Sequence, residues 1–207
     1  VTKTDDLIKS GYLSKFRIKI LLCKHSSQHF ETYHDEIDYL VEHRGRNNLI
    51  KNLVRDLEGN TLVLFNYVEK HGEPLYDLIN SNVKEDRKVF FVHGGTEVVD
   101  REEVRLITEE EDNAVIVASY GTFSTGINIK RLHNIIFASP SKSRIRNLQS
   151  IGRVLRKGEG KNIATLYDIA DDIGGQNYTI RHLNERVNIY NEENFKYEVI
   201  KINFKAN

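Results

Sequence analysis

Short apolar runs alternate with amphipathic stretches through most of the chain. The apolar runs are almost free of polar residues, which is typical of strands that are buried on both faces of a parallel sheet. They lie at residues 61–65, 88–93, 114–119, 134–139 and 162–168. The stretches that repeat apolar residues at helical spacing lie at 69–80, 98–111, 143–157 and 178–190. This alternation predicts βαβ units, and therefore an α/β domain with a mostly parallel sheet flanked by helices.

The two ends of the chain carry further patterns. Capping residues and a closing glycine predict a brief helix within residues 4–13, and alternating apolar and basic residues predict a strand at 16–23. Helical patterns follow at 35–43 and 46–57, and residues 195–204 alternate well enough for an edge strand. We therefore expect a connecting and packing segment at 1–59, the domain itself at 60–190, and a strand and tail at 191–207.

Composition narrows the class of protein. The 207 residues include one cysteine, which rules out an internal disulfide framework and a multi-cysteine zinc site. No apolar run is long enough to span a bilayer, and the first residues lack the apolar core of a signal peptide, so we expect a cytoplasmic protein without a membrane partner. Methionine is absent even at position 1, which leads us to expect a piece of a longer polypeptide.

Charge is balanced overall but uneven along the chain. The 30 basic residues match 30 acidic ones, yet residues 141–161 carry a net charge of +6 and residues 97–112 a net charge of −6. If the basic segment is helical, Gln149, Arg153 and Arg156 project from one face. Two guanidinium groups suit a phosphate well, although a solvated basic helix face is the alternative interpretation.

The loops that follow the predicted strands contain the other candidate residues. Ligands of open parallel sheets bind at the carboxyl ends of the strands, so these loops should converge on one edge. Gly94 and Gly95 allow a close backbone approach by a phosphate, but glycine pairs are also common turn residues. His93 is equally typical of a hydrogen-bonded structural histidine, and Tyr120 could simply cover the sheet edge. The loops lie at 66–67, 92–96, 119–128 and 139–143.

The order of these motifs resembles that of the superfamily-two helicases. The segment Ala-Ser-Tyr-Gly-Thr-Phe-Ser-Thr-Gly-Ile-Asn at 118–128 resembles motif V, and Gln-Ser-Ile-Gly-Arg-Val-Leu-Arg at 149–156 resembles motif VI. Residues 61–67 look like motif IV, and residues 91–96 like the strand and loop that follow it. Residues 7–13 resemble the connection between the two motor domains. The resemblance implies a RecA-like fold and covers roughly residues 60–168.

Two motifs of a complete helicase motor are missing from the sequence. Neither the phosphate loop, Gly-x-x-x-x-Gly-Lys-Ser/Thr, nor an Asp-Glu-x-His acidic box occurs. Because this family divides one ATP site between two RecA-like domains, the resemblance implies the second, C-terminal domain only. ATP and Mg²⁺ would then be bound mainly by an N-terminal domain of the same polypeptide, and we expect the isolated chain to be inactive.

The resemblance also implies roles around ATP. Arg156 matches the arginine finger, which stabilises charge during phosphoryl transfer. Arg153 would hold the γ-phosphate, and Gln149 would sense the nucleotide or the attacking water. Gly126 and Asn128 would lie near the ribose or couple the ATP site to the nucleic acid, although the family often has aspartate where Asn128 stands.

Nucleic acid would be held by its backbone, without reading of sequence. Ser119 matches the position of a phosphate-contacting hydroxyl in the family, and His93, Gly94, Tyr120 and Thr122 are weaker candidates. Such a site suits a motor that moves along a strand.

The resulting expectation is the motor domain of an ATP-dependent DNA or RNA helicase. The motifs are most similar to the bacteriophage branch that acts in recombination and repair, which implies branched DNA and R-loops as substrates and the host cytoplasm as location. One alternative is an ATP-driven translocase that does not unwind. Another is a non-catalytic module that binds nucleic acid through its basic segment. A complete small nucleotide-binding enzyme is disfavoured by the missing phosphate loop.

Overall fold

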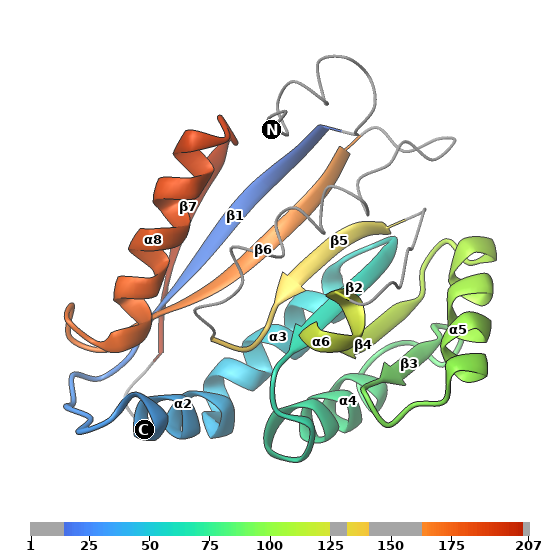
Figure 1. Cartoon of the computed structure of the whole chain (residues 1–207), viewed down its shortest axis with the longest axis horizontal. Helices are drawn as coiled ribbons and strands as arrows, with labels where there is room; N and C mark the ends of the chain where they lie inside the picture. The colour runs from blue at the N-terminus through green and yellow to red at the C-terminus, as the bar shows by residue number, and fades with distance from the viewer. Residues whose placement is uncertain (1–14, 125–131, 141–162, 205–207) are drawn as a thin grey trace.

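A seven-stranded sheet forms the centre of the computed structural model, which describes residues 15–124, 132–140 and 163–204 (Figure 1). The strand order is β3-β4-β2-β5-β6-β1-β7, and all neighbouring strands pair in parallel. The predicted parallel α/β architecture is therefore confirmed. The strands are β1 (Lys15–Lys24), β2 (Asn60–Phe65), β3 (Val89–Val92), β4 (Val115–Ser119), β5 (Leu132–Phe137), β6 (Ile163–Asp172) and β7 (Tyr197–Asn203).

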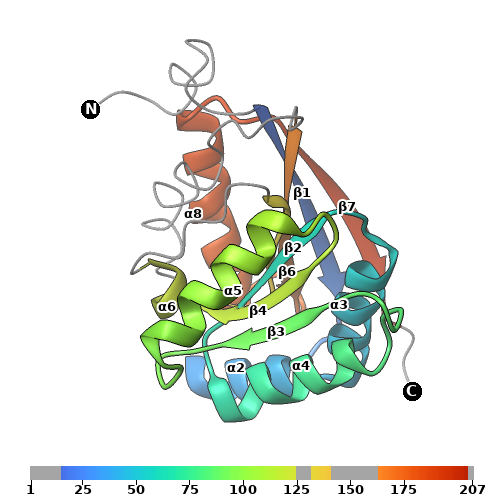
Figure 2. The same ribbon diagram turned by 90° about the vertical axis from the view of Figure 1, so that its right-hand side faces the viewer.

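Helices cover both faces of the sheet (Figure 2). One face carries α3 (Arg44–Asp56) and α4 (Glu73–Asn80), and a single π-helical turn, η1 (Val68–Gly72), leads into α4. The other face carries α5 (Val98–Glu110), α6 (Tyr120–Ser124) and α8 (Tyr178–Glu192). Helix α2 (Tyr33–Glu42) contacts both α3 and α8. It therefore lies where the two faces meet, at the end of β1.

Strand β2 shows why the sequences of the central strands are continuous apolar runs. Leu62 and Leu64 belong to the core cluster under α5, α6 and α8, whereas Val63 and Phe65 belong to the cluster under α3 and α4. All four side chains have no exposed surface, because successive residues of a strand point to opposite faces and both faces are covered.

The predicted elements differ from the observed ones mainly at their ends. The strand predicted at 162–168 continues to Asp172, and the helix predicted from residue 69 begins with the π-helical turn. β1 lies inside the sheet between β6 and β7, and β7 is the predicted edge strand. The helices predicted within 4–13 and at 143–157 lie outside the described residues.

Strand β6 carries a buried carboxylate on each face. Asp168 accepts hydrogen bonds from Arg186 Nε at 2.8 Å and Nη2 at 3.0 Å, and from the Tyr190 hydroxyl at 2.7 Å. Both donors belong to α8, so this cluster fixes the C-terminal helix to the sheet. The Asp168 side chain has no exposed surface and that of Arg186 is 5 % exposed.

Asp171 is the buried carboxylate on the opposite face of β6, and it fixes α3 to the sheet. Its two carboxylate oxygens share the single Nε–H of Arg46 in α3, each at 3.0 Å from the nitrogen, and its Oδ1 lies 2.8 Å from His25 Nε2. Burial acts to raise the pKa of Asp171, but the Arg46 charge and the hydrogen bonds from His25 and Arg46 outweigh it and hold the pKa at about 2, below its ordinary 3.8.

Replacing Arg186 with methionine tests the cluster on α8. Arg186→Met should lower the free energy of unfolding by about 3–5 kcal/mol, because it leaves a buried carboxylate without its cation. Arg181→Met, an exposed arginine of the same helix, should change it by about 0.5 kcal/mol or less. Equilibrium urea unfolding measures both, and equal changes would contradict the assignment.

The pH dependence of stability tests the cluster on α3. Because the folded state lowers the pKa of Asp171, its contribution is complete above about pH 4 and is lost as the pH falls through about 2, with a total on the order of 2 kcal/mol. The matched variant replaces both partners, Arg46→Met with Asp171→Leu, so that no charge is left unpaired. Urea unfolding should show a shallower loss of stability in acid for this variant than for the wild type; parallel curves would refute the assignment.

Candidate functional site

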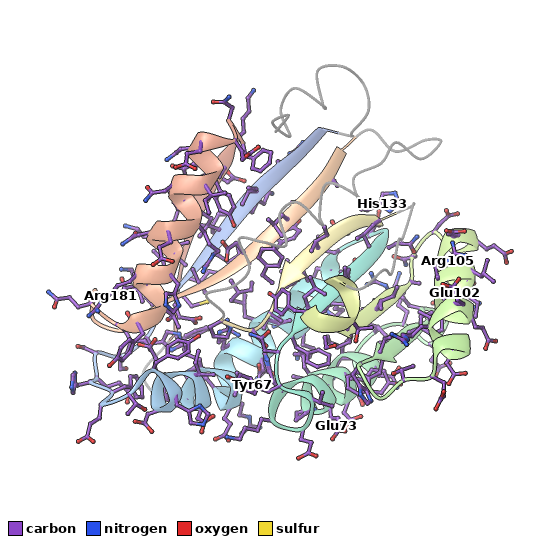
Figure 3. All side chains as sticks on the ribbon, in the orientation of Figure 1. Tyr67, Glu73, Glu102, Arg105, His133 and Arg181 are labelled. Carbon is purple, nitrogen blue, oxygen red and sulfur yellow. The ribbon has the colours of Figure 1, made fainter. Side chains whose placement is uncertain are left out.

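The carboxyl ends of the parallel strands meet at one edge of the sheet. The connection after β2 leads through Tyr67 to α4 on one face, whereas the connection after β4 leads to α6 on the other face (Figures 1 and 3). Adjacent strands whose connections leave to opposite faces form a crevice at their carboxyl ends, which is where open α/β sheets bind ligands. The loops predicted to converge after β2 and β4 therefore flank a point of the kind where such sheets bind ligands.

The hydroxyl-rich segment after β4 begins as a short helix rather than the loop that the sequence suggested. Ser119 Oγ lies 2.7 Å from Thr122 Oγ1 and accepts a hydrogen bond of 3.3 Å from the Thr122 amide, so Ser119 caps the turn. Thr122 is 4 % exposed and Tyr120 is 7 % exposed, with its ring 5.8 Å from that of Phe137. Of these three candidates, Ser119 offers the most accessible side chain.

The loop after β3 is closed by its own hydrogen bonds. His93 Nδ1 accepts from the Gly95 amide at 3.1 Å, and the His93 amide donates to Thr96 Oγ1 at 3.0 Å. These hydrogen bonds are of the kind expected from the structural interpretation of His93. Gly94 is exposed, and a Cβ atom there would meet nothing within 4 Å. The open side of this loop is at Gly94.

A buried hydrogen-bond chain holds the carboxyl end of β5. Ser139 Oγ accepts from the Asn66 amide at 3.0 Å and lies 2.7 Å from His71 Nδ1. His71 Nε2 lies 3.0 Å from Asn47 Oδ1, and Asn47 donates from Nδ2 to the Val41 carbonyl at 2.8 Å. These contacts fit a neutral imidazole that accepts from the serine hydroxyl and donates to the asparagine. The chain links α3, η1 and the ends of β2 and β5.

The same strand end is held by two further contacts. Arg46, the neighbour of Asn47 in α3, donates from Nη1 to the Ala138 carbonyl, and Asn66 donates from Nδ2 to the Pro140 carbonyl at 3.4 Å. The basic segment with the motif VI-like sequence continues from Pro140. Its starting point is therefore tied to α3 and to the end of β2.

Sequence reasoning did not find this chain of contacts. The only available signal was the position of His71 in the apolar repeat formed with Val68, Leu75 and Ile79. A buried histidine at such a position requires polar partners, but nothing in the sequence points to Asn47 and Ser139.

Several predicted site residues lie outside the described residues. They are Gly126 and Asn128, between α6 and β5, and Gln149, Arg153 and Arg156, between β5 and β6. In the part of the chain that is described, no three His, Cys, Asp or Glu side chains are grouped so that they could hold a metal ion. Nor does any helix within these ranges combine the length and apolarity needed to cross a membrane.

Comparisons with known proteins agree with the fold and the motif order. Residues 45–158 match the family model described as the helicase conserved C-terminal domain. The chain is 33 % identical over 221 residues to the ATP-dependent DNA helicase UvsW of Enterobacteria phage T4, which covers 97 % of this chain and 43 % of that protein. The chain therefore spans less than half the length of this curated relative.

Solved structures show the same relationship. The crystal structure of T4 UvsW superimposes with a TM-score of 0.78 at 32 % identity, over 98 % of this chain and 42 % of that one. Domain 2 of the DEAD-box helicase Mss116p, bound to an RNA duplex, has a TM-score of 0.55 at 12 % identity, over 91 % of this chain and 64 % of that one. The second likeness concerns the fold alone, and the RecA-like architecture is confirmed by both.

A double-mutant cycle tests the buried hydrogen-bond chain. His71→Ala and Ser139→Ala should each destabilise the protein, and the pair should show a coupling energy of about 1 kcal/mol because they remove one shared hydrogen bond. His34→Ala, an exposed histidine of α2, is the matched control and should have little effect. Urea unfolding of the four forms measures the coupling, and strictly additive losses would show that the two side chains act independently.

Proposed function

The chain belongs to the family of helicase conserved C-terminal domains, and we propose that it supplies the arginine finger and part of the nucleic-acid track of a two-domain, ATP-dependent motor. The observation that carries this proposal is the order of motifs and strands: the motif V-like sequence begins at the end of β4, and the motif VI-like sequence lies in the segment between β5 and β6. Those strands are parallel and end at one edge, where α/β sheets bind ligands.

The ATP site of this motor is shared between two domains. The N-terminal RecA-like domain of the same polypeptide holds most of ATP and its Mg²⁺, for which this sequence has neither the phosphate loop nor the acidic box. Arg156 stabilises the charge that develops during phosphoryl transfer, Arg153 contacts the γ-phosphate, and Gln149 contacts the nucleotide or the attacking water. Gly126 and Asn128 contact the ribose or couple the ATP site to the nucleic acid. On this proposal the isolated chain does not hydrolyse ATP, because the other half of the ATP site lies in the N-terminal domain.

The nucleic-acid track lies along the carboxyl edge of the sheet. Ser119 contacts a phosphate, and the loop with His93 and Gly94 offers its exposed backbone beside it. The low exposure of Thr122 and Tyr120 favours an indirect role for both over direct contact with the strand, and the Thr122 hydroxyl pairs with that of Ser119. Backbone contacts of this kind do not depend on base sequence, which suits a protein that moves along a strand.

The substrates proposed for the full-length protein follow from its relative. UvsW of a bacteriophage is described as an ATP-dependent DNA helicase, which supports DNA as the substrate. From the motif resemblance we further propose that the full-length protein acts on branched DNA and R-loops in recombination and repair, in the cytoplasm of a phage-infected cell. Closure of the two motor domains on ATP, repeated with each hydrolysis, moves the pair along one strand.

The finger is tested by Arg156→Ala in the full-length protein. Nucleic-acid-stimulated ATP hydrolysis should fall by about 10³-fold or more, because an arginine finger contributes about 10³–10⁵ in rate. Binding of single-stranded DNA without ATP should persist. Lys157→Ala, which removes the neighbouring charge, is the matched control and should retain ATP hydrolysis.

Three results would change the proposal. Near wild-type hydrolysis by Arg156→Ala would refute the finger assignment. An equal loss of DNA binding in both variants, with hydrolysis retained, would favour a plain electrostatic patch. Hydrolysis without strand displacement by the wild type would identify a translocase that does not unwind.

A further inference from the structure

A second pair of adjacent strands with diverging connections, β1 and β6, ends at the same edge of the sheet. The chain leaves β1 toward α2 and α3 on one face, whereas it leaves the adjacent β6 toward α8 on the other face. The divergence opens a cavity of about 420 Å³ between the loop after β1 and the turn before α8. Topology alone predicts a ligand at such a point, and the volume is within the usual range for small-molecule sites.

The cavity walls combine aromatic rings with hydrogen-bonding side chains. Phe30 in the loop after β1 and Tyr178 at the start of α8 are half-buried and line it, and the Arg181 guanidinium lies 5.7 Å from the centre of the Tyr178 ring. Figure 3 shows Arg181 at the outer end of this region, at the start of α8. Ser27 and Gln176 add polar groups. Aromatic faces, polar side chains and a nearby guanidinium are what proteins use to bind the bases of a single strand.

The positions of Glu36 and Arg181 determine where the cavity can bind a negatively charged group of a ligand. Glu36 lines the cavity without any exposed surface, and its carboxylate accepts from the Tyr178 amide at 3.0 Å and the Thr179 amide at 2.7 Å. The first amides of α8 are therefore already used by a negative charge, which disfavours a phosphate at the floor of the cavity. The exposed Arg181 offers a positive charge at the rim instead. This arrangement fits a nucleotide whose base lies inside the cavity and whose phosphate lies outside it, at Arg181.

The walls are held close together by the backbone. Gly174 has a φ of +96°, and a Cβ atom there would lie 2.6 Å from Ser27 Oγ. The turn after β6 and the loop after β1 thus touch at one side of the cavity, where only glycine fits. The cavity is a built feature of these two loops and not a gap between independent segments.

We propose that this cavity binds one nucleotide of a single strand, with its base between the loops and its phosphate at Arg181. The proposal rests on the proposed function, because it extends the same track. Three β-strand spacings, or about 14 Å, separate β4 from β6 in the sheet. A single strand of nucleic acid that lies along the edge at Ser119 therefore has to extend only a short distance to reach the cavity.

The test blocks the cavity and removes its rim charge in the full-length protein. Ser27→Trp fills the cavity, Arg181→Ala removes the guanidinium, and both residues are exposed, so neither change should disturb the core. Arg55→Ala is the matched control: Arg55 is exposed in the last turn of α3, just before β2 begins, and therefore at the opposite edge. The probe is a fluorescein-labelled oligothymidylate, and its Kd is measured by anisotropy without ATP.

The two cavity variants should each weaken binding of the oligothymidylate about 5-fold to 10-fold, in keeping with the loss of one stacked base or one charge contact, and Arg55→Ala should not. Ser27→Trp should lose its effect when the same probe carries abasic sites. Wild-type Kd values for both cavity variants, with melting temperatures unchanged, would overturn the proposal.

Free thymidine monophosphate separates the two possible sources of a nucleotide. If the cavity variants lose binding of the mononucleotide but bind the oligothymidylate normally, the cavity serves a free nucleotide and the strand proposal is wrong. The outcome of these binding measurements does not depend on the outcome of the Arg156→Ala experiment, because they are made without ATP and leave Arg156 unchanged.

Discussion

The two buried carboxylates of β6 are the constraint on which the arrangement of the chain depends. Asp168 and Asp171 lie on opposite faces of one strand, and each is costly to bury without a cation. The cations come from helices on either side of the central strands in the sequence: Arg46 belongs to α3, before β2, and Arg186 to α8, after β6. The segments before and after the central strands are therefore integral to the fold, and β1 and β7 pair in the same sheet as β2 and β4.

This constraint also connects packing to the candidate site. Arg46 reaches both Asp171 and the Ala138 carbonyl, while the next residue, Asn47, reaches His71 and through it Ser139. Helix α3 thus joins the ion pair on β6 to the carboxyl end of β5. Because the motif VI-like segment continues from that end, the origin of the segment is fixed by contacts that lie entirely within the core.

The sequence predicted those features that are encoded locally. Continuous apolar runs such as that of β2 indicated buried parallel strands because both faces of each strand are covered, and motif order indicated the family. The insertion of β1 between β6 and β7 had no local signal, since strand order depends on pairing between distant residues. The same holds for His71. Ser119 and Thr122 fitted a phosphate site by residue type, but their hydroxyls also satisfy each other, and only coordinates reveal such a pairing.

The position of the helices explains why one edge of the sheet can carry an extended site. Helices α5, α6 and α8 cover one face and α3 and α4 the other, so the chain must leave β4 and β2 toward different faces, and must do so again at β6 and β1. Each divergence separates two loops at the carboxyl edge, which is where α/β sheets bind ligands. On our proposals, the hydroxyl of Ser119 at the first divergence contacts a backbone phosphate, and the rings of Phe30 and Tyr178, which line the cavity at the second, contact a base. A single strand of nucleic acid presents both chemical groups in every nucleotide, so two sites on one edge suit it better than they suit a ligand held at either point alone.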